Sequence, residues 1–171
     1  MEKEMHPVVK LAKDTVESYI SADSATKPGE LVTEMKERAG VFVSIHKHGQ
    51  LRGCIGTFEA VQDNVAEEIK ANAISSATGD PRFPPVKVSE LAELEYNVDI
   101  LSKPEKIEGV GQLDSRRYGV IVESGLRRGL LLPDLEGVDT VEKQIEICRM
   151  KAGIPFNAPV TLYRFEVRRY K

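Results

Sequence analysis

Apolar and polar positions alternate along the chain with two periods, which predict helices and β-hairpins in succession. Apolar residues at helical spacing predict helices over 9–20, 65–78 and 140–152. A polar loop is expected over Ser21–Glu30, where Pro and Gly interrupt the pattern. A strand is expected over Leu94–Leu101, because apolar residues there occupy every second position.

Two hairpins follow from the same pattern. In the first, the strand Val41–His46 is followed by a tight turn and a return strand over Leu51–Thr57. The second hairpin turns around Ser124–Arg128. Between the hairpins, a short helix is expected over Val88–Leu94. A final strand with an irregularity is expected over 160–170. Because helices and hairpins are interspersed without a repeating βαβ unit, the predicted fold class is α+β, with antiparallel or mixed sheets and flanking helices.

Composition narrows the class of protein. The 171 residues fit one domain, and 41% apolar with 30% charged residues is typical of a soluble globular chain. The apolar runs are too short to span a membrane, and the N-terminus has no secretory signal pattern. Two cysteines, Cys54 and Cys148, are too few for a disulfide framework, so we expect a cytoplasmic protein. A net charge of −3 disfavours nucleic acid as a partner.

Several segments, in order, resemble a known family. They are LRGCIGT at Leu51–Thr57, DPRFPPV at Asp80–Val86, the stretch Tyr118–Pro133, and KAGI at Lys151–Ile154. Together they resemble the AMMECR domain family, whose prokaryotic members are called AmmeMemoRadiSam system protein A. The resemblance implies a single AMMECR-like domain over 1–171, with a larger and a smaller lobe around a cleft. It also implies Memo-type and radical SAM proteins as partners, but it implies no particular reaction.

The motif LRGCIGT holds the most distinctive chemistry in the chain. As a strand, it places Arg52, Cys54 and Gly56 on one face, whereas Leu51 and Ile55 make the other face the buried one. A fixed cation lowers the pKa of a neighbouring thiol, and the same guanidinium can hold a small anionic ligand by two parallel hydrogen bonds. The glycines of the motif would let a ligand approach the backbone closely. The candidate ligand-binding residues of the motif are Arg52, Gly53, Gly56 and Thr57.

Residues outside the motif complete the candidate site. Pairing the two strands of the hairpin puts His46 on the face of Cys54, which makes His46 a candidate base. A slip of one residue would move His46 to the other face, so the register stays open. Asp80 is placed to fix Arg82 or to reach toward Arg52, and we expect both loop residues at the rim of the site.

A structural role for the same residues is the alternative. Small cysteines in strands are often core residues, strand glycines often mark close packing, and Arg52 can pair with a structural carboxylate. His46 and His48 have the spacing of a metal-binding pair, but no third ligand is near in sequence, so no metal site is predicted. Cys148 lies on the apolar stripe of its helix and is expected in the core.

Three functions are compatible with these features, and whether the protein is an enzyme stays open. The first is an enzyme that acts on a small molecule or a protein side chain, with Cys54 as nucleophile and Arg52 as anion clamp. The second is a binding or adaptor module that presents the LRGCIGT cleft to a partner without chemistry. The third is recognition of RNA or a nucleotide by the arginine pairs of the second half. It ranks last, because it needs aromatic residues that stack on bases, and most of the ten Phe and Tyr residues fall in strand patterns. No cofactor motif is visible, and the sequence defines neither the substrate nor the oligomeric state.

Overall fold

The computed structural model describes residues 4–22 and 29–171, which form two compact units. The first unit extends to Leu101 and also includes Arg168–Lys171, whereas the second is Ser102–Val167. Antiparallel strand pairs build a sheet in each unit, and helices flank both sheets, which confirms the predicted α+β class. Most of the loop expected over Ser21–Glu30 lies outside the described residues. The cleft implied by the family resemblance stays a prediction.

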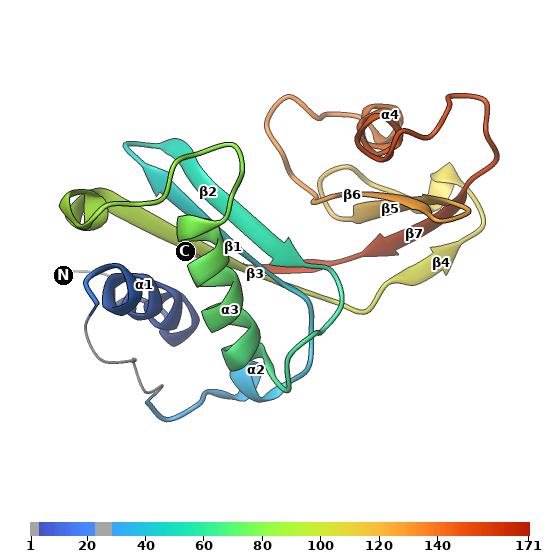
Figure 1. The fold of residues 1–171 in the computed structure, drawn as a ribbon. Helices are drawn as coiled ribbons and strands as arrows, with labels where there is room; N and C mark the ends of the chain where they lie inside the picture. The colour runs from blue at the N-terminus through green and yellow to red at the C-terminus, as the bar shows by residue number, and fades with distance from the viewer. Residues whose placement is uncertain (1–3, 23–28) are drawn as a thin grey trace. The chain divides into compact units, whose positions relative to one another are not determined.

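The first unit contains the motif LRGCIGT. Its elements are α1 (Pro7–Ile20), α2 (Thr33–Lys36), β1 (Val41–Lys47), β2 (Gln50–Thr57), α3 (Val65–Thr78), the 3-10 helix η1 (Val88–Glu93), β3 (Leu94–Leu101) and β8 (Val167–Tyr170). The strand order of its sheet is β2-β1-β3-β8, so the motif lies on an edge strand. Figure 1 shows α1 and α3 side by side along one face of this sheet.

The core of the first unit lies between this sheet and the two long helices. Alternate residues of β1 and β3 meet the apolar stripes of α1 and α3, as the two periodicities predict. Its fully buried members include Val9, Val16, Val41, Val43, Ile45, Ile69, Ala73, Val98 and Ile100. The opposite face of the sheet, which these helices do not cover, is called the open face below.

A stripe of buried polar residues on α3 ties this helix to the β1–β2 hairpin. The side-chain amide of Asn72 donates to the carbonyl of Val41 at 2.9 Å. One turn later, the hydroxyl of Ser76 donates to the carbonyl of Val43 at 2.7 Å. These bonds satisfy polar groups that would be costly to bury alone. They also hold α3 close to the backbone of the hairpin.

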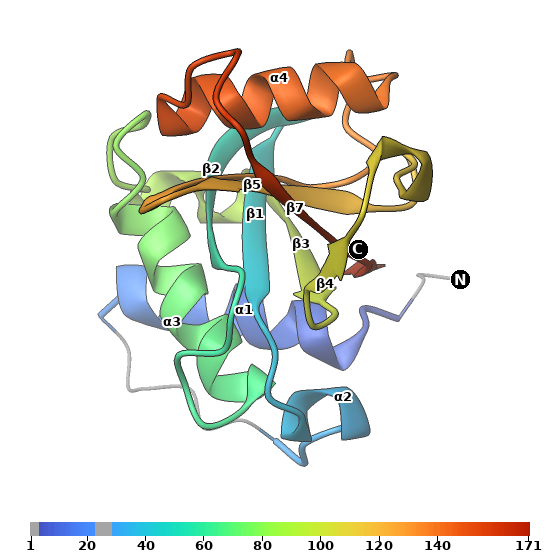
Figure 2. The same ribbon diagram turned by 90° about the vertical axis from the view of Figure 1, so that its right-hand side faces the viewer.

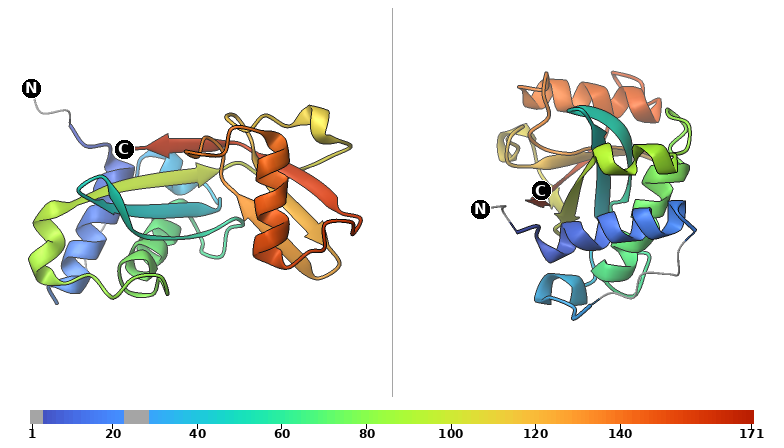
Figure 3. Two further views of the ribbon diagram at one scale, coloured as in Figure 1. Left: turned by 90° about the horizontal axis from the view of Figure 1, so that it is seen from above. Right: turned by 90° about the vertical axis from the view of Figure 1, so that its left-hand side faces the viewer.

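The second unit is a smaller sheet covered by one long helix. Its elements are β4 (Glu105–Ile107), the 3-10 helix η2 (Val110–Gln112), β5 (Gly119–Ser124), β6 (Arg127–Leu131), α4 (Val141–Ala152) and β7 (Thr161–Phe165). The strand order is β4-β7-β5-β6, and α4 packs on β5 and β6 along one face of this sheet (Figures 2 and 3). Cys148 of α4 is fully buried in the core of this unit, as its position on the apolar stripe predicts.

The final strand is where the expected fold needs a correction. The sequence predicts one irregular strand over 160–170, but the chain forms two strands that belong to different sheets. Glu166 separates β7 from β8 and marks the change of sheet. Neither the short helix α2 nor the three-residue strand β4 is predicted by the periodicity, because both are too short to show a period. No helix in residues 4–22 or 29–171 is long and apolar enough to cross a membrane.

Candidate functional site

The hairpin that carries the motif has the predicted partners. β1 and β2 pair antiparallel, and the turn between them contains two residues with positive φ, His48 at 51° and Gly49 at 76°. Two successive positive φ angles are the mark of a type I′ turn, whose twist matches that of paired strands. Glycine suits the second position because it adopts this backbone conformation without steric cost.

A bulge beside this turn determines where the motif's side chains point. Ile45 pairs with Gly53, and the next residue, His46, pairs with Leu51, so Arg52 is an extra residue in β2. A bulge of this kind bends the strand and breaks the alternation of its side chains. Leu51 is therefore opposite His46 rather than on the core face, and its side chain is 38% exposed. The predicted burial of Leu51 is wrong for this reason.

Past the bulge, cross-strand pairing arranges the open face in three rows. The row that contains the thiol consists of Cys54 on β2, Ser44 on β1 and Asn97 on β3. The neighbouring rows are Leu51–His46–Glu95 on one side and Gly56–Phe42–Asp99 on the other. His46 therefore shares a face with Cys54, as predicted, but it lies in a different row.

The Cys54 thiol has a hydroxyl as its hydrogen-bond partner. The Oγ atom of Ser44 lies 3.3 Å from the Sγ atom of Cys54. Burial raises the pKa of the Cys54 thiol, and the hydrogen bond from Ser44 and the charge of Arg82 only partly oppose this effect. The predicted lowering of the thiol pKa is therefore wrong, because desolvation outweighs the neighbouring cation.

Arg52 is held by a carboxylate that the sequence analysis did not single out. Its Nε and Nη2 atoms donate to the two oxygens of Glu90 at 3.0 and 3.1 Å, and Nη1 donates to the carbonyl of Pro84 at 2.8 Å. Lys47 adds a second cation, 3.3 Å from Glu90. The hydrogen bonds from Arg52, opposed by burial, lower the pKa of Glu90 to about 2. The donors of Arg52 therefore bind the protein itself in this structure, and binding of an anionic ligand by Arg52 stays a prediction.

The two glycines of the motif lie against protein atoms rather than beside open space. A Cβ atom on Gly53 would lie 2.1 Å from the backbone oxygen of Ser76 on α3. A Cβ atom on Gly56 would lie 2.2 Å from the ring of Phe42. Both positions need glycine for close packing, and the expected approach of a ligand to their backbone stays a prediction.

Thr57 has a structural setting at the end of β2. Its hydroxyl donates to the buried carboxylate of Glu68 at 2.7 Å. The same carboxylate accepts the backbone N–H groups of Val61 and Gln62 at 3.1 and 2.7 Å. Thr57 therefore belongs to a network that fixes the loop after β2.

Asp80 and Arg82 bind the backbone of Cys54. The buried carboxylate of Asp80 accepts the N–H of Cys54 at 3.0 Å, and Arg82 Nη2 approaches the carbonyl of Cys54 at 3.4 Å. Arg82 also donates to Asp80 from its side chain at 2.8 and 3.1 Å, which confirms the prediction that Asp80 fixes Arg82. These hydrogen bonds hold the pKa of the Asp80 carboxyl well below its usual range, against the opposing effect of burial. Because β2 is an edge strand, this pair satisfies groups that a further strand would otherwise satisfy.

Sequence reasoning did not single out Ser44, Glu90 or Asn97 as site residues. Ser44 and Asn97 alternate with core residues of their strands, so strand periodicity already placed them on the face of Cys54. Glu90 is 38 residues from Arg52, and nothing local links the two. No cluster of three metal-ligating side chains occurs within the described ranges.

Comparison with known proteins agrees with the sequence motifs. A profile of the AMMECR1 family matches residues 9–170. A protein of Thermotoga maritima is 53% identical over 170 residues, which is 97% of this chain and 98% of the relative. A protein of Clostridium acetobutylicum is 45% identical over 99% of this chain, which spans only 36% of that longer relative. The crystal structure of an uncharacterised protein from Pyrococcus horikoshii has a TM-score of 0.86 and 33% identity, covering 95% of this chain and 88% of that one. The resemblance seen in the motifs is thus confirmed, and the chain belongs to the AMMECR1 family.

Proposed function

We propose that this protein is a binding module whose partner contacts the open face of the first unit, with Cys54 as a neutral thiol in the contact surface. The setting of this thiol carries the proposal, because Cys54 is half-buried on the open face and its bonded neighbour is the hydroxyl of Ser44, and burial raises its pKa. This is the second of the functions considered from the sequence, the adaptor without chemistry of its own.

The surroundings of Cys54 favour a binding module over an enzyme. A nucleophilic cysteine needs a thiolate, which a lowered pKa or an adjacent base supplies. Arg52 is paired with Glu90, and His46 is one row from Cys54, a backbone spacing of about 7 Å along the strand. A serine hydroxyl is no base at neutral pH. Binding of a small anionic ligand by Arg52 would require its guanidinium to exchange Glu90 for that ligand.

The open face has features that favour contact with another protein. It carries the aromatic Phe42 beside small polar side chains, and Leu51 adds exposed apolar surface. Aromatic residues are enriched at the centres of protein interfaces, and the Asp99 carboxylate beside Phe42 is buried and paired with Arg169. The edge of this face is fixed by the Asp80–Arg82 pair, so little ordering entropy is lost on binding.

The family resemblance names the partners to test first, a Memo-type protein and a radical SAM protein of the same cytoplasm. The experiment is isothermal titration calorimetry of each purified partner into the full chain. Ser44→Arg places a charged, bulky side chain in the middle row, and Ser89→Arg makes the same change at an exposed position of η1. We expect a partner to bind the wild-type chain. Ser44→Arg should weaken that binding at least about tenfold, equivalent to about 1.4 kcal/mol, whereas Ser89→Arg should leave the affinity unchanged.

A second variant separates binding from chemistry. Cys54→Ser keeps a small hydrogen-bonding group in the row, so the affinity for the partner should change by less than about threefold. Circular dichroism and the thermal midpoint establish that each variant is folded. Equal binding by Ser44→Arg and the wild type would contradict the proposal, as would a turnover of the mixture that disappears with Cys54→Ser.

A further inference from the structure

Three large apolar side chains of the second unit are exposed around the C-terminal end of α4. Leu126, in the turn between β5 and β6, is fully exposed, Met150 in the last turn of α4 is 69% exposed, and Phe156 in the loop after α4 is 87% exposed. Figure 2 shows this turn and the end of α4 at the same end of the unit. Arg127 joins them, because its Nη1 atom donates to the carbonyl of Gly153, directly after α4.

The fold explains neither Leu126 nor Met150 as an apolar residue. Gly125, with φ at 60°, and Leu126 form a two-residue turn of type II′, which restricts only its first residue. Met150 is two positions from the buried Cys148, so it lies on the opposite side of α4 from the core. Single exposed apolar residues are ordinary, but several gathered at one place are typical of contact surfaces.

Three cations are the direct sequence neighbours of these apolar residues. Arg127 follows Leu126 in the chain, whereas Arg149 and Lys151 flank Met150. The six residues Leu126, Arg127, Arg149, Met150, Lys151 and Phe156 are called the α4-end patch below.

The cations of the α4-end patch keep their charge because their partners are uncharged. Arg149 donates to the carbonyl of Pro155 at 2.7 Å, and Lys151 donates to the carbonyl of Leu130 at 3.0 Å. Like Arg127, both therefore bind backbone oxygens. None of the three forms an ion pair with a carboxylate in the part of the chain that the structure describes.

Nearby acidic residues do not cancel this positive charge. Glu123 and Glu146 are the two acids within 123–128 and 146–158, and each has a basic partner outside the three cations. The α4-end patch is therefore locally positive in a chain whose net charge is −3. A surface of this sign favours a negatively charged partner.

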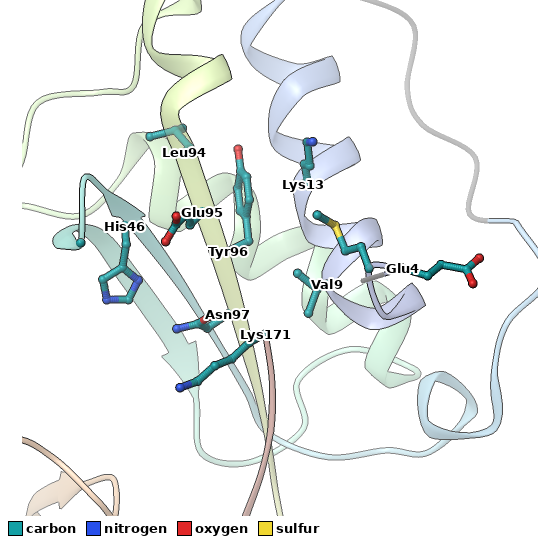
Figure 4. Close-up of a pocket in the computed structure, with 11 residues that line it drawn as sticks. Glu4, Val9, Lys13, His46, Leu94, Glu95, Tyr96, Asn97 and Lys171 are labelled. Atoms are coloured by element: carbon teal, nitrogen blue, oxygen red, sulfur yellow. The ribbon is translucent and has the colours of Figure 1, made fainter. Parts of the chain in front are cut away.

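A cavity in the first unit shows no comparable preference. It has a volume of about 510 Å³, and its lining balances Glu4 and Glu95 with Lys13 and Lys171 (Figure 4). Because these charges cancel, they do not define the charge of a ligand. The α4-end patch does define it.

From these observations we propose that the α4-end patch binds an acidic amphipathic helix of a partner protein. The apolar face of that helix covers the three exposed apolar side chains of the patch, and its carboxylates pair with the three cations. Apolar anchors with charged groups at the rim are the usual composition of a protein interface. Because the carbonyls already hold the cations in place, little side-chain entropy is lost on binding.

Two other occupants fit the α4-end patch less well. An added strand is disfavoured, because Lys151 already occupies the carbonyl of Leu130 on the edge strand β6. An anionic membrane is disfavoured, because Glu146 lies one turn before Met150 on the same side of α4 and would face the lipid phosphates. A helix presents separate side chains from a backbone that is already hydrogen-bonded, which suits both constraints.

The test uses fluorescein-labelled, end-capped peptides of about 16 residues, long enough to form a helix, and fluorescence anisotropy with the full chain. The first peptide has leucine at helical spacing with glutamate and alanine between. The second has the same composition with its leucines spread around the helix, and the third has lysine in place of glutamate. At about 0.15 M salt, we expect the first peptide to bind at least about fivefold more tightly than either of the others.

Matched variants locate the binding surface. Phe156→Ser should weaken binding of the first peptide about fivefold, whereas Val110→Ser, at an exposed apolar position of η2, should leave it unchanged. Lys151→Gln keeps a hydrogen-bond donor but removes the charge, so it should weaken binding about two- to threefold. Lys106→Gln, at an exposed position of β4, should have no effect. Circular dichroism and the thermal midpoint establish that each variant is folded.

Several results would overturn the proposal. They are no saturable binding of the first peptide up to about 1 mM, equal affinities for the first and second peptides, or equal effects of Phe156→Ser and Val110→Ser. Flotation with phosphatidylglycerol vesicles that requires Phe156 would assign the patch to a membrane instead. A dimer in sedimentation that Phe156→Ser dissociates would assign it to a second copy of the chain. The experiment does not involve the Cys54 row, so this proposal and the proposed function fail separately.

Discussion

The carboxylate of Asp80 accepts the backbone N–H of Cys54 at 3.0 Å, across 26 residues of sequence. This bond joins the two most distinctive motifs of the chain, LRGCIGT and DPRFPPV, at the exposed edge of the first sheet. The loop DPRFPPV therefore binds the strand LRGCIGT through the backbone of Cys54. This hydrogen bond fixes β2, and the position of β2 in turn orients the Cys54 thiol.

Asp80→Ala should destabilise the fold. The change leaves the N–H groups of Cys54 and Arg82 without their acceptor, and a buried unsatisfied group costs about 1–3 kcal/mol. We expect the free energy of unfolding in urea to fall by about 2 kcal/mol, a moderate value because the Arg82 side chain is 56% exposed and can be solvated. The exposed residue Asp63 provides the control, and Asp63→Ala should change stability by less than about 0.5 kcal/mol. Equal effects of the two variants would contradict the structural role of Asp80.

Glu90 should make stability depend on acidic pH. Its pKa in the folded protein is about 2, below the value of about 4.3 for an unfolded chain, so the ionised form stabilises the fold. This contribution is fully present above about pH 4.5 and is lost as the pH falls toward 2. Urea unfolding of wild type and Glu90→Gln should differ by about 2 kcal/mol more at pH 7 than at pH 2. A difference that does not vary with pH would show that the Arg52–Glu90 pair does not act through charge.

Much of this arrangement follows from the periodicity of the sequence. Alternation along β1 places Ser44 and His46 opposite the core, and the pairing with β2 then brings Cys54 to the same face. The bulge could not be predicted, because one extra residue, Arg52, leaves no trace in the apolar pattern. A one-residue shift of this kind moved Leu51 out of the core.

The chemistry of the motif was harder to predict than its fold. Whether Arg52 binds a ligand or the protein depends on Glu90, which reaches it only through tertiary structure. The glycines gave an ambiguous signal, since a missing side chain serves a ligand or a neighbouring helix equally well. The short distance between an added Cβ atom on Gly53 and the backbone oxygen of Ser76 shows that Gly53 makes room for α3.

Gly53→Ala should be strongly destabilising. The added methyl group would lie 2.1 Å from the Ser76 backbone oxygen, so α3 or β2 must shift. Overpacking of this kind costs about 1–3 kcal/mol, and we expect the upper end because the neighbour is backbone. Gly109→Ala is the control, because no atom lies within 4 Å of the added Cβ and the backbone there is extended. Thermal unfolding of both variants compares them directly, and equal midpoints would contradict the close approach of α3 to β2.

Tyr96→Phe should leave stability unchanged or raise it. The Tyr96 hydroxyl is buried and has no hydrogen-bond partner among residues 4–22 and 29–171. Removing an unsatisfied buried hydroxyl relieves a desolvation penalty, so the free energy of unfolding should rise by up to about 1 kcal/mol. Tyr19→Phe on α1, where the side chain is 55% exposed, is the control and should have no effect. A loss of more than about 1 kcal/mol in Tyr96→Phe would reveal a hydrogen bond to that hydroxyl.

The rate of Cys54 alkylation tests the central claim that this thiol is a neutral contact group. Native protein is treated with iodoacetamide from pH 6 to 10, and the label at each cysteine is measured by peptide mapping. Cys148, fully buried and with a pKa raised to about 12, should stay unlabelled and serves as the internal control. Cys54 should react more slowly at pH 7 than N-acetylcysteine, with a midpoint at higher pH, and Arg82→Ala should raise that midpoint further because Arg82 favours the thiolate. Faster labelling of Cys54 than of N-acetylcysteine at pH 7, with a midpoint at lower pH, would contradict the account and restore Cys54 as a nucleophile.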